Sequence, residues 1–188
     1  MQPKSYPEVS DDFGHWLAGF IDGEGCFSVS YNGARPQRSM RCQFRIALRS
    51  DDTPLLDDCQ RITGLGSVYQ QAAREGNANP SAMWHVAHRE DTARLVTLLE
   101  RYPLRSKKRR DFVIWAEAVS VRNSAPRSMG RNASFPPETR ARLERLRTML
   151  MEGRRWRDHE SVLVSEPLDH DAVPSGCDLF GIQERMDL

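Results

Sequence analysis

The sequence predicts an α+β fold in which helices pack against a small antiparallel sheet. Two patterns support this. Residues 13–23 place apolar side chains and glycines at helical spacing. From residue 26 the apolar side chains recur at every second position, which is typical of a strand with one buried face. Both patterns return along the chain in the order helix, two strands, helix, two strands, helix, with further helical segments behind them.

Each element has its own boundary signals. Ser10, Asp11 or Asp12 can cap the first helix, and Gly64 and Gly66 end the second. Asp91 is expected to cap the third helix. Helices are expected over about 13–23, 53–63, 91–99, 107–121 and 139–152, and strands over 26–31, 41–49, 67–73 and 82–88.

The second strand has the clearest alternation in the chain. Its apolar face is formed by Cys42, Phe44, Ile46 and Leu48, and its polar face by Arg41, Gln43, Arg45 and Arg49. A lone amphipathic strand is usually a half-solvated sheet. Arginine and glutamine, however, match the edges of guanine and adenine in the major groove of DNA. The polar face is therefore interpreted as a DNA-contacting surface.

Charge is unevenly distributed along the 188 residues, although the net charge is only +1. Residues 158–188 hold eight acidic residues and one basic residue, a net charge of −7, so residues 1–157 have +8. A basic body with an acidic tail suggests a domain that binds a polyanion. We expect a leader over 1–12, a core domain over 13–121, a C-terminal loop and helix over 122–157, and a tail over 158–188. The tail could be disordered, fold back over the basic face or dock a partner.

No apolar run approaches the roughly 18 residues of a membrane span, and no signal peptide opens the chain. The four cysteines show no C-x-x-C pairing, which argues against a zinc cluster or a disulfide framework. Likewise, His85 and His88 fall on opposite faces of a strand and do not form a metal pair. These features favour an intracellular protein in a reduced compartment that does not bind membranes.

The stretch Trp16–Phe27 organises the rest of the chain. Gly19 and Gly23 share one face of the first helix, and interior glycines that each cost roughly 1 kcal/mol suggest close approach of another backbone. Glu24 lies at the negative end of the helix dipole, where a carboxylate and free carbonyls suit a hard metal ion. The string Leu17-Ala18-Gly19-Phe20-Ile21-Asp22-Gly23-Glu24-Gly25 resembles the motif of the LAGLIDADG homing endonucleases. The alternative is an apolar helix with a glycine C-cap.

The resemblance covers roughly 13–121 and implies an αββαββα domain whose curved antiparallel sheet sits on DNA. Because only one copy of the motif is present, it implies a homodimer that packs the two motif helices together through Trp16, Gly19, Phe20 and Gly23. It also implies hydrolysis of double-stranded DNA with Mg²⁺ (or Mn²⁺ or Ca²⁺) at a near-palindromic target, leaving 3′ overhangs. Glu24 and the Gly23 carbonyl would hold the metal, while Asp22 would be a structural hydrogen-bonding group.

In this family a lysine that follows a Pro-Leu break lies near the scissile phosphates. Lys107 is the best match for this catalytic lysine, and Lys108 is the second choice. The residues expected to contact DNA lie on the strands and their connections or in this basic cluster, and they are Ser28, Ser30, Asn32, Arg35, Arg38, Arg41, Gln43, Arg45, Tyr69, Gln71, Arg74 and Lys108.

One departure from the family pattern bears on activity. Leu48 stands where many members carry a glutamine near the catalytic water. Either Arg49 or another residue takes over that role, or cleavage is impaired. The competing hypothesis is therefore a protein of this fold that does not cut, acting as an intron RNA maturase or as a sequence-specific DNA-binding regulator.

Overall fold

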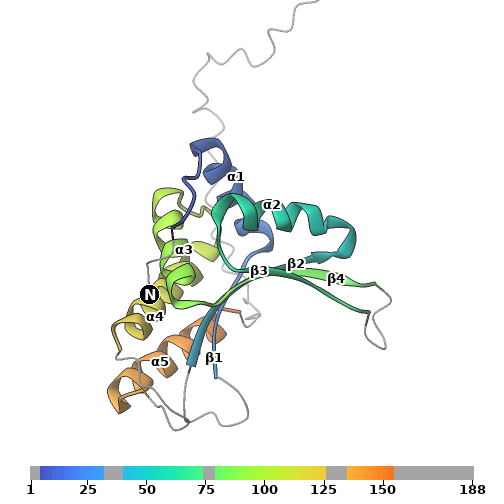
Figure 1. Ribbon diagram of the computed structural model, residues 1–188. Helices are drawn as coiled ribbons and strands as arrows, with labels where there is room; N and C mark the ends of the chain where they lie inside the picture. Colours follow the sequence, from blue (N-terminus) through green and yellow to red (C-terminus); the bar gives the residue numbers. More distant parts are fainter. Residues whose placement is uncertain (1–4, 32–39, 74–78, 126–134, 155–188) are drawn as a thin grey trace, which may run out of the picture. The chain divides into compact units, whose positions relative to one another are not determined.

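A four-stranded antiparallel sheet with strand order β1-β2-β4-β3 forms the centre of the fold (Figure 1). The computed structural model describes residues 5–31, 40–73, 79–125 and 135–154. The strands are β1 (Cys26–Tyr31), β2 (Met40–Arg49), β3 (Ser67–Gln71) and β4 (Ser81–Val86). The helices are α1 (Asp11–Glu24), α2 (Thr53–Thr63), α3 (Arg89–Arg101), α4 (Lys108–Ser124) and α5 (Pro137–Arg154), with a short 3₁₀ helix η1 (Ser50–Asp52). The order of helices and strands predicted from the sequence is confirmed.

One face of the sheet forms the core. The predicted apolar side of β2 is buried through Cys42, Phe44 and Ile46, and Trp84 of β4 is fully buried beside Phe44. The Trp84 indole N–H donates to the Leu65 carbonyl at 2.8 Å, which satisfies its one polar atom. Helices α1, α2, α3 and α4 contact this sheet, and α2 lies along it in Figure 1. The opposite face carries the polar side chains of all four strands.

Helix α1 is capped at both ends by specific hydrogen bonds. Its N-terminus is capped by Ser10, whose hydroxyl accepts from the Phe13 N–H at 3.4 Å, as expected. Leu17 and Ile21 are fully buried against the sheet. At the other end the Gly25 N–H donates to the Ile21 carbonyl at 2.8 Å, and a Cβ on Gly25 would lie 2.7 Å from that oxygen. Glycine is therefore required where the motif turns from α1 into β1.

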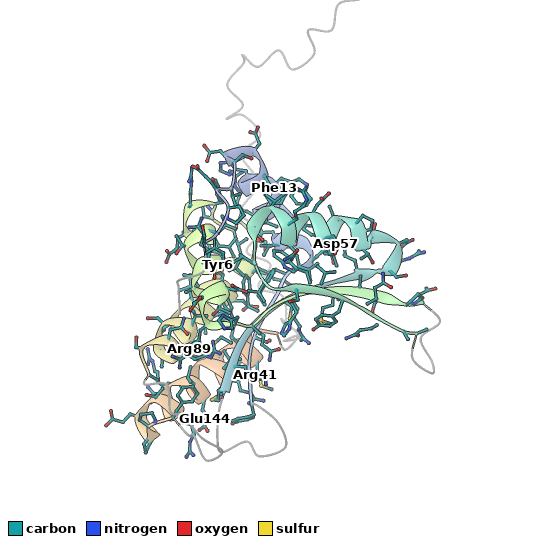
Figure 2. All side chains as sticks on the ribbon, in the orientation of Figure 1. Tyr6, Phe13, Arg41, Asp57, Arg89 and Glu144 are labelled. Atoms are coloured by element: carbon teal, nitrogen blue, oxygen red, sulfur yellow. The ribbon has the colours of Figure 1, made fainter. Side chains whose placement is uncertain are left out.

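Residues 5–12 are not the loose leader that the sequence suggested. Val9 is buried in the core, and Asp11 and Asp12 already belong to α1. The Tyr6 hydroxyl, which lies beside α3 in Figure 2, donates to a carboxylate oxygen of Asp91 at 2.7 Å. These contacts fasten the N-terminal segment to α3.

The same contacts correct the expected role of Asp91. Helix α3 begins at Arg89 with His88 at its N-cap position, and Asp91 lies inside the first turn. Its second oxygen accepts from the Gly66 N–H at 3.0 Å, so the buried carboxylate ties α3 to the start of β3 instead of capping the helix. Strand limits also change: β2 and β4 each begin one residue earlier, at Met40 and Ser81, and β3 and β4 each end two residues earlier, at Gln71 and Val86.

The final helix, α5, is longer at both ends than predicted but has the predicted apolar seam. Leu143, Leu146 and Leu150 are buried, and α5 packs against α4 and β1. Its leucines join the same core as the residues of 13–121, so α5 is an integral layer of this unit. None of the helices within the described ranges combines the length and hydrophobicity that a bilayer span requires.

Candidate functional site

The motif turn at the end of α1 is held in place by Asp22. One carboxylate oxygen accepts from the Arg105 N–H at 2.7 Å, and the other accepts from the Ser106 hydroxyl at 2.7 Å. The Ser106 N–H lies 3.2 Å from both oxygens. Asp22 therefore clamps the loop between α3 and α4 against the end of α1. As predicted, it is a hydrogen-bonding group whose oxygens are already occupied.

The clamp perturbs the titration of Asp22. Burial alone would raise its pKa, but the hydrogen bonds from Arg105 and Ser106, with the charge of Lys108 nearby, hold the pKa below its ordinary value of 3.8. A depressed carboxylate pKa contributes stability above the unfolded-state pKa, and this stability is lost as the pH falls through the folded-state pKa.

Replacing Asp22 by asparagine is therefore expected to lower the free energy of unfolding by roughly 1–2 kcal/mol at neutral pH, since charge-assisted hydrogen bonds are lost. The difference between the two proteins should shrink as the pH falls below 3.8. Urea denaturation of both proteins at a series of pH values measures this. A difference that stays constant into acid would show that the charge of Asp22 does not contribute.

The loop that Asp22 holds delivers Lys108 to the end of α1. The Lys108 ammonium donates to the Gly23 carbonyl at 2.6 Å and lies 3.3 Å from the Ile21 carbonyl. Its own backbone N–H donates to the Ser106 hydroxyl at 3.1 Å. The carbonyl end of a helix is the negative end of its dipole, so a cation is favoured there. The structure thus brings Lys108 to the Gly23 carbonyl, and Glu24 is the next residue along the chain.

Lys107, the first choice from the sequence, lies elsewhere. It is exposed at the N-cap position of α4. There it contributes to a groove of about 540 Å³ between α4 and α5, lined by Ser106, Lys107, Arg109, Arg110, Val113, Ile114 and Met149. Successive helical residues project about 100° apart, so only one of the two lysines can face the end of α1. On this geometry, Lys108 is the lysine that lies at the end of α1.

Glu24 is the acidic residue of the motif turn that stays exposed. Its carboxylate is a hard oxygen donor suited to a divalent cation such as Mg²⁺. The Gly23 carbonyl fits that role less well, because the Lys108 ammonium already lies 2.6 Å away and would repel a cation there. Within the described part of one chain, no three His, Cys, Asp or Glu side chains gather closely enough to hold a metal ion. A divalent ion held by Glu24 would have to complete its coordination with water, backbone carbonyls or groups from outside the chain.

Cys42 and Cys59 are buried in the core. Burial raises the pKa of both Cys42 and Cys59 to about 12, so neither thiol is available as a thiolate ligand. Cys26, Cys42 and Cys59 are all free. Cys177 lies outside the described residues.

The face of α1 turned away from the sheet exposes aromatic side chains and two glycines. Trp16 is 43% exposed and stacks on Phe20 at 5.2 Å between ring centroids. Apart from the adjoining residues and the backbone of the helix itself, no atom lies within 4 Å of a Cβ built on Gly19 or Gly23. Beside Gly19 is a hollow of about 260 Å³, bounded by His15, Ala18, Asp22, Pro103 and Arg105. The four residues predicted for a subunit interface thus form one surface, with space at both glycines for another backbone.

Seven of the twelve residues predicted to contact DNA lie on the exposed face of the sheet, namely Ser28, Ser30, Arg41, Gln43, Arg45, Tyr69 and Gln71. Strand register aligns Ser28 with Gln43 and Ser30 with Arg41, and it places Tyr69 and Gln71 on the same face across β4. Arg41 and Arg45 are exposed, and Tyr69 is 40% exposed. Asn32, Arg35, Arg38 and Arg74 lie outside the described residues. Lys108 is the first residue of α4, and its ammonium reaches the turn at the end of α1.

Register adds His85 to this face, although the sequence pattern predicted only that His85 and His88 do not form a metal pair. His85 lies opposite Arg45 on β2 and Ser67 on β3. Its Nε2 lies 2.9 Å from Oε1 of Gln43, and the Gln43 amide nitrogen donates to the Ser30 hydroxyl at 2.5 Å. Burial, and then the charges of Arg45 and Arg41, lower the pKa of His85. The network crosses β1, β2 and β4 on the exposed side of the sheet.

Leu48 and Arg49, the two residues at the position where a glutamine was expected, lie on opposite faces of β2. The Leu48 side chain is partly buried against the core. Arg49, the suggested substitute, projects from the opposite face of β2 and pairs with Asp51 at 3.0 Å. Neither side chain supplies the amide that a glutamine would place at this position.

Known proteins resemble this chain in both sequence and fold. The probable intron-encoded endonuclease Cox1-I1b of Schizosaccharomyces pombe is 25% identical over 114 residues, which cover 60% of this chain and 28% of that protein. The probable intron-encoded endonuclease 3 of Neurospora crassa is 28% identical over 114 residues, which cover 58% of this chain and 20% of that protein. The chain thus spans between a fifth and a third of the length of these curated relatives.

Solved structures share the fold. The homing endonuclease I-TnaI matches with a TM-score of 0.56 at 22% identity, over 77% of this chain and 89% of that one. The archaeal intron-encoded homing endonuclease I-Vdi141I, solved in complex with DNA, matches with a TM-score of 0.60 at 20% identity, over 81% and 91%. The homing endonuclease I-CvuI, solved with a DNA target in the presence of Mg, matches with a TM-score of 0.59 at 17% identity, over 78% and 84%.

A family model described as LAGLIDADG endonuclease matches residues 17–119. The match begins inside α1 and ends inside α4, so it includes the motif turn, the whole sheet and Lys108. It covers more than half of the 188 residues and agrees with the helix and strand order of the structure. This chain therefore belongs to the LAGLIDADG endonuclease family.

Proposed function

We propose that the protein is a site-specific endonuclease that hydrolyses double-stranded DNA with Mg²⁺ as a homodimer. The observation that carries this proposal is the motif turn, where an exposed carboxylate and a lysine lie together at one helix end. The polar face of the sheet adds a surface of arginine, glutamine and serine side chains that suits base edges and phosphates. A near-palindromic target and 3′ overhangs belong to the same proposal.

The chemistry divides among a few groups of the chain. Mg²⁺, when bound, would neutralise the charge that develops on the attacking and leaving oxygens of the phosphodiester. Glu24 would hold the ion through a carboxylate oxygen. Lys108 would donate to the reacting phosphate, whose negative charge grows as the water oxygen bonds to phosphorus and the bridging P–O bond breaks. Asp22 would keep Lys108 in position through the loop at Ser106.

Two copies are needed because one chain offers a single exposed motif carboxylate. Packing α1 of one copy against α1 of another, through Trp16, Gly19, Phe20 and Gly23, would bring the two Glu24 side chains together at the centre of a two-fold site. The space at Gly19 and Gly23 supports this arrangement, since a residue with a Cβ there would hold the helices apart.

Replacing Gly19 by leucine is expected to weaken the dimer about tenfold or more, because overpacking a helix contact costs roughly 1–3 kcal/mol. The folded monomer should be unaffected, since the site is open within one chain. Analytical ultracentrifugation over a concentration series measures the dissociation constant, and circular dichroism checks folding. Ala141→Leu, on the exposed side of α5, is the matched control. Equal dimer stability in Gly19→Leu and Ala141→Leu would remove α1 from the interface.

The function itself is tested with a randomised duplex library. The wild-type protein should enrich particular sequences when binding is selected in Ca²⁺, and it should cut the enriched duplexes on both strands when Mg²⁺ is supplied. Gel mapping of the two ends reports the overhang. Enrichment without cleavage would show that the protein binds specific DNA sequences but does not cut them. No enrichment would overturn the proposal that it recognises DNA sequence.

Leu48 favours the non-cleaving alternative. Leu48 has no amide, so the site has one fewer group with which to position the attacking water. Arg49 does not replace it, because its guanidinium is paired with Asp51. A regulator that binds DNA without cutting it, or a maturase that binds intron RNA, would tolerate this loss. Incubating the protein with intron RNA from its host gene separates the last case: accelerated splicing, together with absent DNA cleavage, would favour the maturase.

A further inference from the structure

Gln43 is the central residue of the hydrogen-bonded network on the exposed sheet face. Its side chain comes from β2, between Ser30 of β1 and His85 of β4. The Gln43 nitrogen donates to the Ser30 hydroxyl at 2.5 Å, and the Gln43 oxygen lies 2.9 Å from Nε2 of His85. The amide is therefore hydrogen-bonded to side chains of both neighbouring strands and is half-buried.

The two hydrogen bonds constrain the orientation of the Gln43 amide to different degrees. A serine hydroxyl can donate or accept, so Ser30 would accommodate either orientation of the amide. An amide oxygen only accepts, whereas Nε2 of a neutral histidine donates in one tautomer and accepts in the other. With the hydrogen on Nε2, at 2.9 Å from Oε1, His85 holds the oxygen of Gln43 toward β4 and the nitrogen toward β1. Its ring is supported from β3 by an edge contact with Tyr69, with the centroids 6.1 Å apart.

The network leaves part of the amide unused. A glutamine amide has two N–H donors and two acceptor lone pairs. Ser30 takes one donor and His85 takes one lone pair. One donor and one acceptor remain, which is the pair that matches N7 and N6 of adenine in the major groove.

The order of the free N–H donor and the free acceptor on the amide determines which orientation of an adenine–thymine pair it can bind. An A·T pair presents N7 and then N6 across the major groove, and a T·A pair presents them in the reverse order. An amide that can flip satisfies both pairs, whereas an amide held with oxygen toward β4 satisfies only one.

We propose that His85 is a positioning residue for base recognition: by donating to Oε1 of Gln43, it fixes the amide so that Gln43 selects adenine on one strand of the target and rejects the reversed pair. The inference rests on the proposed function, because it requires the sheet face to lie in a major groove. It adds a residue and a specific discrimination to that function.

The test begins with the library selection described above, carried out with the wild type and with Gln43→Leu. The base pair whose preference disappears in Gln43→Leu is the one that Gln43 contacts. Duplexes carrying A·T or T·A at that pair are then compared by competition binding for the wild type, His85→Phe, His85→Lys and Ser30→Ala. Phenylalanine keeps a ring but has no donor, and lysine has only donors.

The wild type should prefer one of the two duplexes about 10- to 100-fold, which is the discrimination that a good bidentate contact provides. His85→Phe should bring the two within about twofold of each other while still preferring both to G·C, because the amide is free to flip. His85→Lys should retain the preference, and Ser30→Ala should lower affinity for both duplexes without equalising them. A merely structural role of His85 would not move the ratio of A·T to T·A binding.

The outcomes are separable. If His85→Phe keeps the wild-type ratio, or if the wild type selects no adenine at the pair that Gln43 contacts, the inference about His85 is overturned and the proposed function stands. If the wild type enriches no sequence from the library, the proposed function falls and the inference falls with it.

Discussion

Replacing Glu24 by glutamine is expected to slow DNA cleavage about 1,000-fold, because removing a metal ligand forfeits several kcal/mol of transition-state stabilisation and each 1.36 kcal/mol is tenfold in rate. Glutamine has nearly the same shape but only a neutral oxygen, so it binds a hard divalent cation poorly. The side chain is exposed at the end of α1, and the substitution should leave the core undisturbed. The measurement is single-turnover cleavage of a library-selected duplex in Mg²⁺.

The matched control is Glu100→Gln, which removes the same charge from an exposed position of α3. Both variants should bind the duplex, since neither residue lies on the polar face of the sheet. Cleavage by Glu24→Gln at the rate of Glu100→Gln would show that the motif carboxylate does not hold the ion, and the proposed mechanism would have to be abandoned.

Much of the fold could be predicted because local patterns determine it. The alternation of β2 specified both faces of the sheet, since side chains on a strand alternate strictly between the two sides. Helix α2 was predicted to the residue, from its apolar spacing and from Gly64, which adopts a left-handed conformation at its C-cap. The N-terminal segment was missed because its anchor is a hydrogen bond between Tyr6 and Asp91, 85 positions apart in the sequence. No local pattern reveals such a pair.

The candidate site was predictable only in part, for a similar reason. Glu24 and the role of Asp22 followed from the motif, which is continuous in sequence. The choice between Lys107 and Lys108 depends on where α4 begins, and that is set by the bonds of Ser106 to Asp22 and Lys108. His85 lies on the polar face of the sheet because of the register of β4 against β2 and β3, which the sequence does not specify. Residues placed by long-range pairing are thus the ones that sequence patterns do not reveal.

Replacing Lys108 by methionine is expected to slow cleavage about 100-fold, which is the usual effect of removing one preorganised donor to a developing negative charge. The same change in Lys107 should have the smaller effect on cleavage, because its side chain lies in the groove between α4 and α5. Methionine keeps the length of the stem without the charge. Melting temperatures of both variants should stay close to that of the wild type, since Lys107 is exposed and Lys108 only half-buried.

A second readout separates a chemical role from a structural one. The Lys108 ammonium lies 2.6 Å from the Gly23 carbonyl, so it competes with any cation that approaches this oxygen. Lys108→Met should therefore lower the Mg²⁺ concentration that gives half-maximal cleavage, even though the maximal rate falls. A lysine that merely props the loop would lower the rate without shifting the metal dependence in this direction. If Lys107→Met shows the larger loss and the metal shift, the catalytic lysine is the one that the sequence first indicated, and α4 must reposition when DNA binds.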